Sequence, residues 1–408
     1  MNPVADLLIT GASEVVTCLS SPDDPAGRLE GAVVAIGGET ILSVGSEMEV
    51  AQATDCSAAT RIDAEGGVVA PGFVDCHTHL VFGGSRSLEY AARLTHSVAE
   101  VRELGIPSGI SATVAMTRAA SASELVQSAS VRLADMLRHG TTTAESKTGY
   151  GLTLDEELKL LEVNRSLDAG QPVDIVSTFM GAHDFPPEMS ADRYVEYVIE
   201  DMIPAVAESG LASFNDVFLD DGYYSVAQAR RILEAGAEAG LPAKVHTEQY
   251  SSLGGGDMAA EIGVVSADHL NYSSPATLEA LARAGSVGVV MPLLDFAVAH
   301  PQPASARAVL DSGLTLALAT DLCPGCYAVS MHLALQVACR TSGITVEEAI
   351  LAATAGAAAA LGLEDRGRLG PGMLADIQIW NVPKLEDVAY RIGHNATSRV
   401  IKRGKVAI

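Results

Sequence analysis

Two histidines, His77 and His79, stand two residues apart at the end of a short apolar stretch that begins at a Pro71-Gly72 turn. Residues two apart in a β-strand point to the same face, so both imidazoles can aim at one point. Convergent imidazoles are metal ligands, and this pair would need a third nitrogen and a carboxylate from elsewhere. Taken alone, the pair is equally compatible with a buried strand that carries two surface histidines.

Between residues 67 and 366 the chain alternates apolar strand candidates with helix-like stretches. Capping residues mark several helix starts, as at Ser121-Ala122-Ser123-Glu124. Eight strand–helix units in a row predict an α/β fold, a parallel (β/α)8 TIM barrel, whose chemistry lies at the carboxyl ends of the strands. An open doubly wound sheet is the alternative, but no Gly-x-Gly-x-x-Gly follows the first strand. The strand candidates are residues 74–77, 141–146, 174–180, 216–219, 243–246, 266–269, 287–291 and 316–320.

Both ends of the chain have the pattern of short strands separated by turns. Residues 1–66 and 367–408 are therefore predicted to form one composite β-sandwich domain beside the barrel. Its expected strands are residues 6–10, 14–19, 31–36, 40–45, 61–63, 375–380 and 399–408.

Polar residues at the predicted strand ends supply the missing metal ligands. His246 ends the fifth strand and Asp321 follows the eighth, on the face where a barrel carries out its chemistry. Three imidazoles and one carboxylate suit zinc, with iron as the alternative. The predicted ligands are therefore His77, His79, His246 and Asp321, with a water molecule completing the centre.

A metal centre of this kind makes hydroxide available near neutral pH, because the metal lowers the pKa of its water towards about 7. Asp321 can take the proton of that water as general base. His269, at the end of the sixth strand, would orient the nucleophile or hold the developing oxyanion. The sequence leaves open which of Asp321 and His269 moves the proton.

The composition excludes several classes of partner. The net charge is −25, from 51 acidic and 26 basic residues, so a phosphate backbone or an anionic membrane would repel the surface. Only six of the basic residues are lysines, a balance that suggests adaptation to high salt. The start of the chain lacks the basic residues of a signal peptide, and six scattered cysteines give no disulfide framework. We expect a cytoplasmic enzyme with a small-molecule substrate.

The stretches around these residues resemble the amidohydrolase superfamily, through PGFVDCHTH at 71–79 and the return to the sandwich at 367–376. Within it, residues 77–86, 140–151, 177–183 and 266–270 are similar to the branch that opens a cyclic amide in histidine degradation. The resemblance implies the fold predicted above, one zinc or iron ion per subunit and a homodimer. Some related barrels bind two metals through a carbamylated lysine on strand four. No lysine lies on that strand here, and Lys147 follows strand two, so one metal is expected.

The resemblance implies that water opens the ring of 4-imidazolone-5-propanoate at its amide carbonyl, giving N-formimidoyl-L-glutamate. Arg86 would bind the propanoate tail, because a guanidinium suits carboxylate capture; a surface ion pair is the alternative. Tyr150 and His183 match positions that contact substrate or product, although simple packing or a loop histidine would also explain them. Gln249 would hydrogen-bond the ring but cannot act as a base, which leaves proton transfer to Asp321 and His269.

The segment after strand eight departs from the pattern of the branch. Many members have Asn two residues after the metal aspartate, followed by Pro-Gly and Ser or Thr, whereas this chain has Cys323-Pro324-Gly325-Cys326. Cys323 and Cys326 occupy positions that otherwise hydrogen-bond the product, and together with Gly325 they are expected to line the substrate pocket. A CxxC pair can also be redox-active or bind metal.

Three other functions remain alternatives at this stage. The nearest is another mononuclear amidohydrolase, such as a heterocycle deaminase, although such enzymes usually carry Glu close to the strand-five histidine. A barrel that only binds a ligand would require the loss of a metal ligand. A Ser-His-Asp hydrolase is disfavoured because no Gly-x-Ser-x-Gly follows a strand.

Overall fold

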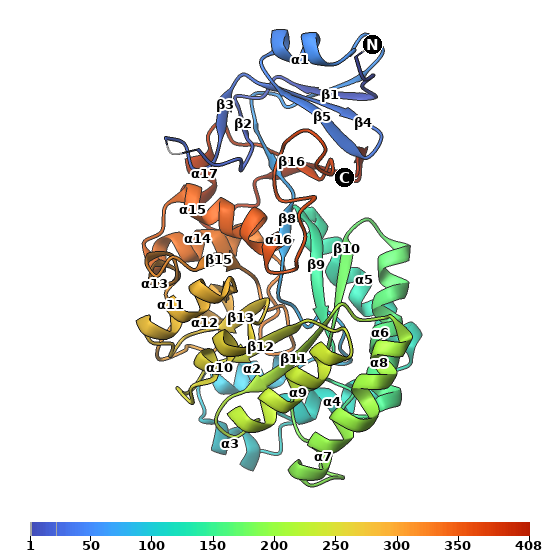
Figure 1. The fold of residues 1–408 in the computed structure, drawn as a ribbon, viewed down its shortest axis with the longest axis vertical. Helices are drawn as coiled ribbons and strands as arrows, with labels where there is room; N and C mark the ends of the chain where they lie inside the picture. The colour runs from blue at the N-terminus through green and yellow to red at the C-terminus, as the bar shows by residue number, and fades with distance from the viewer. Residues whose placement is uncertain (1, 22) are drawn as a thin grey trace.

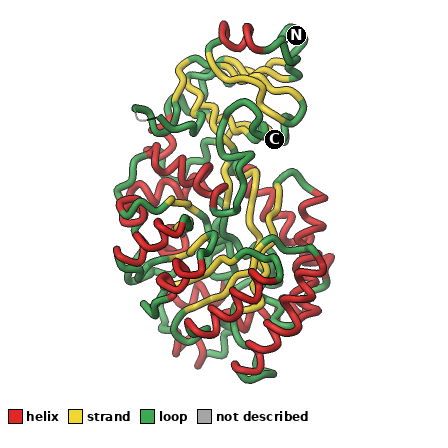
Figure 2. The backbone as a smooth tube through the Cα atoms, viewed as in Figure 1, coloured by secondary structure: helices red, strands yellow, loops and turns green. Residues whose placement is uncertain are grey.

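The computed structural model describes residues 2–21 and 23–408. Two layers of sheet built from both chain ends lie at one end of a (β/α)8 barrel, and both termini lie in this part of the molecule (Figure 1). In Figure 2 the barrel strands run through the interior and helices cover the outside. The predicted fold class is confirmed.

The barrel sheet contains eight strands in sequential order, and each adjacent pair is parallel. Each strand overlaps one of the predicted apolar runs, and the sequential order excludes the doubly wound alternative, which requires a reversal in strand order. The strands are β8 (Phe73–Asp75), β9 (Thr141–Lys147), β10 (Asp174–Ala182), β11 (Phe214–Leu219), β12 (Ala243–Thr247), β13 (Ser266–His269), β14 (Val287–Val290) and β15 (Thr315–Leu318).

The barrel closes through the segments that follow its first and last strands. The backbone N–H of Asp321 donates to the carbonyl of His77 at 3.1 Å, and that of His79 donates to Leu322 at 2.9 Å. Below them, the hydroxyl of Thr320 donates to Asp75 at 2.6 Å. The seam therefore joins the two segments that carry three of the predicted metal ligands.

Helices cover the barrel, and the predicted cap at Ser121 forms a capping box with Glu124 at the start of α5. Among the described residues, no helix has the length and apolar character needed to cross a membrane. The barrel helices are α2 (Ser87–Arg93), α3 (Val98–Glu103), α4 (Gly109–Ala119), α5 (Ala122–Arg138), α6 (Leu154–Gly170), α7 (Ala191–Tyr197), α8 (Ile203–Ser209), α9 (Val226–Glu238), α10 (Gly255–Ile262), α11 (Pro275–Ala284), α12 (Pro292–Ala297), α13 (Ala306–Asp311), α14 (Met331–Ser342), α15 (Val346–Leu351) and α16 (Ala357–Ala359).

The terminal layers are a four-stranded sheet, ordered β5-β4-β1-β6, and a six-stranded sheet, ordered β18-β17-β16-β7-β2-β3. Aliphatic residues from both sheets pack into one core, which makes the pair a sandwich. The elements are β1 (Leu7–Thr10), β2 (Glu14–Val16), β3 (Arg28–Glu30), β4 (Val33–Gly37), β5 (Thr40–Gly45), α1 (Glu47–Ala53), β6 (Thr60–Asp63), β7 (Val68–Pro71), β16 (Ile377–Trp380), α17 (Leu385–Tyr390), β17 (Thr397–Lys402) and β18 (Lys405–Val406).

Strand β7 connects the sandwich to the barrel. It pairs with β16 and β2 in the six-stranded sheet and, after Gly72 alone, continues into β8. It lies beyond residue 66, where the sequence placed the end of the first sandwich segment, so the six-stranded sheet includes residues up to Pro71. The histidine motif at residues 77–79 therefore follows a strand that both ends of the chain hold in place.

Candidate metal centre and active-site cavity

The four predicted metal ligands converge at the carboxyl end of the barrel. His77 and His79 directly follow β8, His246 lies near the end of β12, and Asp321 follows β15. The Nε2 atoms of His79 and His246 are 3.3 Å apart, and Nε2 of His77 is 3.8 Å from Oδ1 of Asp321. All four side chains are buried.

These donor atoms fit a single metal ion. Within the described part of the chain, Nε2 of His77 and Oδ1 of Asp321 are buried and have no hydrogen-bond partner. Two nitrogens bound to one tetrahedral zinc at about 2.0–2.1 Å lie about 3.3 Å apart, which is the separation of the His79 and His246 nitrogens. A second set of mutually close donors, from His77, His246 and His269, shows that His269 also borders the centre.

Two buried carboxylates orient the ligand imidazoles. Nδ1 of His77 lies 2.6 Å from Asp268, and Nδ1 of His246 lies 3.1 Å from Asp216. A carboxylate accepts a hydrogen bond, so each Nδ1 carries the proton and each Nε2 presents its lone pair to the centre. Burial holds the pKa of both histidines well below the usual range, which keeps the rings in the neutral form that binds metal.

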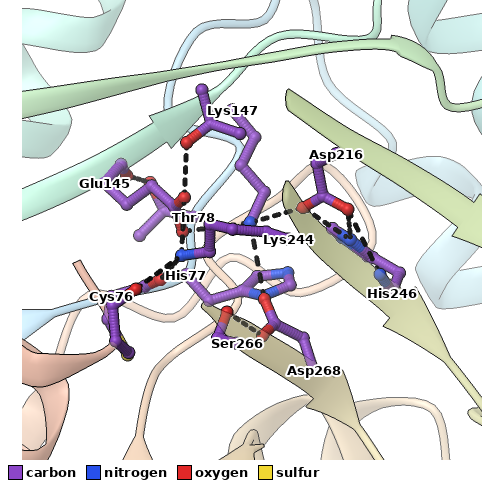
Figure 3. A network of polar contacts seen from close by, with 12 residues as sticks. Cys76, His77, Thr78, Glu145, Lys147, Asp216, Lys244, His246, Ser266 and Asp268 are labelled. Carbon is purple, nitrogen blue, oxygen red and sulfur yellow. Dashed lines mark hydrogen bonds and ion pairs between the residues drawn. The ribbon is translucent and has the colours of Figure 1, made fainter. Parts of the chain in front are cut away.

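A network of charged side chains, none exposed to solvent, lies behind these carboxylates in the barrel interior (Figure 3). Burial alone would lower the pKa of Lys147, but the surrounding carboxylates outweigh it, so its pKa lies above the ordinary lysine value. Sequence reasoning assigned no role to this network. The sequence does contain a sign of it: Glu145 and Lys147 lie two apart in a buried strand, so both charged side chains must point to the same side. The network consists of Glu145, Lys147, Asp216, Lys244 and Asp268.

Two site residues have left-handed backbone conformations. The φ angle is 81° at His269 and 49° at Asp321. Such conformations cost non-glycine residues about 1–3 kcal/mol each and concentrate at functional sites. Here they turn the chain sharply at the ends of β13 and β15, which directs both side chains into the centre.

Asp321 and His269 have different acid–base properties. Burial raises the pKa of Asp321 to about 7, whereas burial lowers that of His269 to about 3. A carboxylate that titrates near neutral pH can accept and return a proton, although a bound cation would lower its pKa again. A neutral His269 is suited to donate a hydrogen bond from one ring nitrogen. Burial thus places the pKa of Asp321 near neutral and that of His269 well below it.

Three of the four candidate metal ligands, His79, His246 and Asp321, line a cavity of about 520 Å³. This volume suits a small molecule. The cavity is bordered by the loops after the barrel strands and by the segment from α2 to α4. Most of the predicted site residues line it: His79, Arg86, Tyr150, His183, His246, Gln249, His269, Asp321, Cys323 and Gly325.

Arg86 reaches the cavity from the start of α2, but it is not a free cation. Its Nε and Nη2 atoms bind the carboxylate of Glu89 at 2.6 and 3.0 Å. The remaining nitrogen, Nη1, lies beside Gly325, where a Cβ atom would be 3.7 Å from it. Arg86 can therefore offer Nη1 to a ligand while Glu89 holds the guanidinium in one orientation.

Tyr150 and His183 form one wall beside the ligand His79. The His183 ring stacks on that of His79, with centroids 4.7 Å apart and planes 9° apart, and the Tyr150 ring lies 5.2 Å from His183. Nδ1 of His183 is 3.2 Å from the carbonyl of Gly149. Because a carbonyl oxygen only accepts hydrogen bonds, Nδ1 of His183 carries the proton and Nε2 is left as an acceptor. These contacts place both rings directly beside the candidate metal centre.

Gln249 and its neighbour Glu248 point in different directions after β12. Gln249 lines the cavity, and its side-chain nitrogen donates to the hydroxyl of Tyr250 at 2.9 Å. Glu248 instead accepts a hydrogen bond from the hydroxyl of Ser273. The Gln249 amide, hydrogen-bonded to Tyr250, is therefore a polar group that this segment presents to the cavity.

The CxxC segment forms a tight turn in which Cys323 and Cys326 exchange backbone hydrogen bonds of 3.0 and 3.1 Å. Cys323 and Gly325 line the cavity. Cys326 is buried behind the turn, where its sulfur lies 3.9 Å from the carbonyl of Thr320, and it borders a neighbouring apolar groove. The structure thus brings Cys323 and Gly325, but not Cys326, to the predicted substrate pocket.

The model of the amidohydrolase family matches residues 68–407. The chain therefore belongs to the amidohydrolase family. Solved structures have the same fold: a zinc complex of an atrazine chlorohydrolase from Arthrobacter aurescens has a TM-score of 0.75 at 17% identity, covering 98% of this chain and 94% of that one. A zinc-bound adenosine deaminase from Xanthomonas campestris has a TM-score of 0.73 at 18% identity, covering 100% and 93%.

Curated relatives define the branch of the family. An imidazolonepropionase from Symbiobacterium thermophilum is 44% identical, covering 100% of this chain and 98% of the relative. Imidazolonepropionases from Geobacillus kaustophilus and Halobacterium salinarum are each 42% identical and cover at least 98% of both chains. Within the amidohydrolases, the chain is a member of the imidazolonepropionases.

Proposed function

We propose that this chain hydrolyses the ring amide C–N bond of 4-imidazolone-5-propanoate and releases N-formimidoyl-L-glutamate, a step of histidine degradation. The observation that carries the proposal is the convergence of His77, His79, His246 and Asp321 beside a cavity that Arg86 also lines. Full-length similarity to imidazolonepropionases supports this substrate.

One zinc or iron ion per chain would be held by those four residues. When bound, the ion supplies Lewis acidity that brings the pKa of water close to neutral. Zinc in two amidohydrolase neighbours supports this choice, with iron as the alternative.

The side chains of the site then account for the remaining chemistry. Asp321 takes a proton from the attacking water and returns it to the ring nitrogen that leaves, so that water is added across the C–N bond. His269 donates a hydrogen bond to the carbonyl oxygen as negative charge develops there. We therefore propose that Asp321 carries the proton and that His269 stabilises the oxyanion.

The cavity wall supplies the substrate contacts. Nη1 of Arg86 binds the propanoate carboxylate, and Glu89 holds the guanidinium in place. Tyr150 and His183 contact the ring on one side, and the Gln249 amide bonds its edge. Cys323 and Gly325 close the pocket beside Arg86, and we propose that Cys326 supports their turn from behind.

The direct test follows the absorbance of imidazolone propanoate with and without a chelator. We expect loss of absorbance, formation of the formimidoyl product and about one equivalent of zinc or iron per chain. Chelation should stop the reaction, and added metal should restore it. Ammonia release from cytosine or guanine, without hydrolysis of imidazolone propanoate, would instead identify a deaminase.

We also propose a homodimer in the cytoplasm of an organism adapted to high salt. The excess of acidic residues supports the last point, because salt screens the repulsion among them. Light scattering tests the dimer. Thermal unfolding in low and high KCl tests the adaptation, and full stability and activity in low salt would contradict it.

A further inference from the structure

Two lysines lie side by side in the barrel interior, and both are fully buried. Lys147 comes from β9 and Lys244 from β12. They share the carboxylate of Glu145, with contacts of 3.1 Å from Lys147 and 2.8 Å from Lys244 (Figure 3). In charge, burial and shared partner the two lysines are therefore closely matched.

The two lysines differ in their other partners. Nζ of Lys147 lies 2.6 Å from Asp216 and 3.4 Å from Asp268. Nζ of Lys244 instead donates to the backbone carbonyls of Cys76 and Ala360 at 3.4 and 3.3 Å. Only Lys147 of this pair contacts the carboxylates that orient metal-site histidines.

Through Asp216 and Asp268, the ammonium group of Lys147 is linked to two histidines of the candidate metal centre. Asp216 receives the Nδ1 proton of His246, and Asp268 receives that of His77. A buried carboxylate without a compensating partner is strongly disfavoured and would rotate or take up a proton. In either case it would no longer hold its histidine in the tautomer and orientation that metal binding requires.

We propose that Lys147 is a positioning residue of the metal centre: its ammonium fixes Asp216 and Asp268 as hydrogen-bond acceptors and thereby aims Nε2 of His246 and His77 at one point. The proposal rests on the metal centre of the proposed function. It assigns Lys244 to the support of Glu145 and the barrel backbone, without a part in metal affinity.

A charge-matched pair of variants tests this assignment. The variants E145Q/K147M and E145Q/K244M each remove one positive and one negative charge, so both keep the net charge of the network. They differ only in which lysine remains. Zinc affinity is measured by competition with a chromogenic chelator, and the visible spectrum of the cobalt(II) form reports the geometry of the ligands. Thermal unfolding of the metal-free proteins measures the structural cost separately.

We expect E145Q/K147M to bind zinc about 10–100-fold more weakly than wild type, with an altered cobalt spectrum. We expect E145Q/K244M to stay within a few-fold of wild type, although both variants lose thermal stability. Equal zinc affinities in the two variants would overturn the proposal. If E145Q/K147M does not fold, the zinc affinities of K147Q and K244Q are compared instead. Glutamine removes the ammonium charge but keeps an N–H donor that helps the barrel interior to fold. The same two outcomes then apply.

The readout separates this inference from the proposed function. Wild-type protein that binds zinc but does not hydrolyse imidazolone propanoate would contradict the proposed substrate and leave the role of Lys147 intact. Equal affinities in an enzyme that hydrolyses the substrate would contradict only the role of Lys147.

Discussion

The core of the sandwich and the centre of the barrel contain different kinds of side chain. The sandwich core contains aliphatic side chains such as Ile9, Ile36 and Ile379. The centre of the barrel contains three carboxylates and two lysines, all without solvent exposure. Aliphatic burial contributes stability directly, whereas buried ion pairs are often no more stabilising than apolar residues of similar volume. Buried side chains at the barrel centre therefore serve function, whereas those in the sandwich serve stability. Substitutions should mainly change activity in the first region and the free energy of unfolding in the second.

The largest effect should come from Asp321 in the barrel. We expect D321N to lower kcat by about 10²–10⁴-fold, because it removes the proton acceptor. Thermal stability of the metal-free protein should stay unchanged or rise, since asparagine tolerates the left-handed backbone and a buried charge is lost. Product formation and thermal unfolding measure the two quantities. Retained activity with reduced stability would break the contrast between the cores.

A substitution in the sandwich should do the opposite. We expect I379A to lower the free energy of unfolding by about 2–5 kcal/mol, because it leaves a cavity in the aliphatic core. The kcat and KM of the folded fraction should not change. Urea unfolding gives the stability, and V406A on the exposed strand β18 is the matched control. A change in KM beyond a few-fold would show that the sandwich core also positions the site.

Arg86 should affect substrate recognition more than stability. We expect R86Q to lower kcat/KM by about 10–150-fold, equivalent to about 1.5–3 kcal/mol for a charge-assisted bond. The double variant R86Q/E89Q removes repulsion by the unpaired Glu89 and should recover part of this loss. The control substrate is an imidazolone ring without the propanoate tail. An equal loss with that ring would contradict carboxylate binding by Arg86.

The smallest effect should come from Arg28, which joins the sandwich to the barrel surface. Its guanidinium lies 2.8 Å from Glu14, 2.6 Å from Glu386 and 3.2 Å from Glu347, and its side chain is partly exposed. Solvent screens such pairs, so we expect R28A to cost about 1 kcal/mol or less in low salt, and less again in high salt. A loss above that of I379A would mean that the junction, rather than the sandwich core, limits stability.

Most of the fold could be predicted because its signals are local. Apolar runs mark the eight barrel strands, and Ser121 and Ser225 mark helix starts that the structure contains. Strand β3 was not predicted, because its three residues include two charged ones and lie at a sheet edge. Helix α1 was not predicted either, although Ser46 and Glu49 form a capping box that is readable in the sequence.

The site was less readable than the fold. Strand ends indicated that His246 and Asp321 could join His77, because parallel strands end on the same face. The pairing of Asp268 with His77 depends on the curvature of a closed barrel, which brings β13 opposite β8 and which no local pattern contains. The direction in which the Cys326 side chain points depends likewise on the tight turn at Pro324-Gly325, which the sequence pattern alone does not determine. For these reasons the convergence of the four expected ligands could be predicted, whereas the side chains behind them could not.

The seam of the barrel has a consequence for the synthesis of the protein. The hydrogen bond between Asp75 and Thr320 joins residues 245 positions apart in the chain. His77 and His79 leave the ribosome long before Asp321 does, so a nascent chain offers a passing metal ion only an incomplete set of donors. An ion held by the four proposed ligands would therefore bind tightly only after the last barrel strand has been made. Closure of the seam would then couple binding of that ion to completion of the fold.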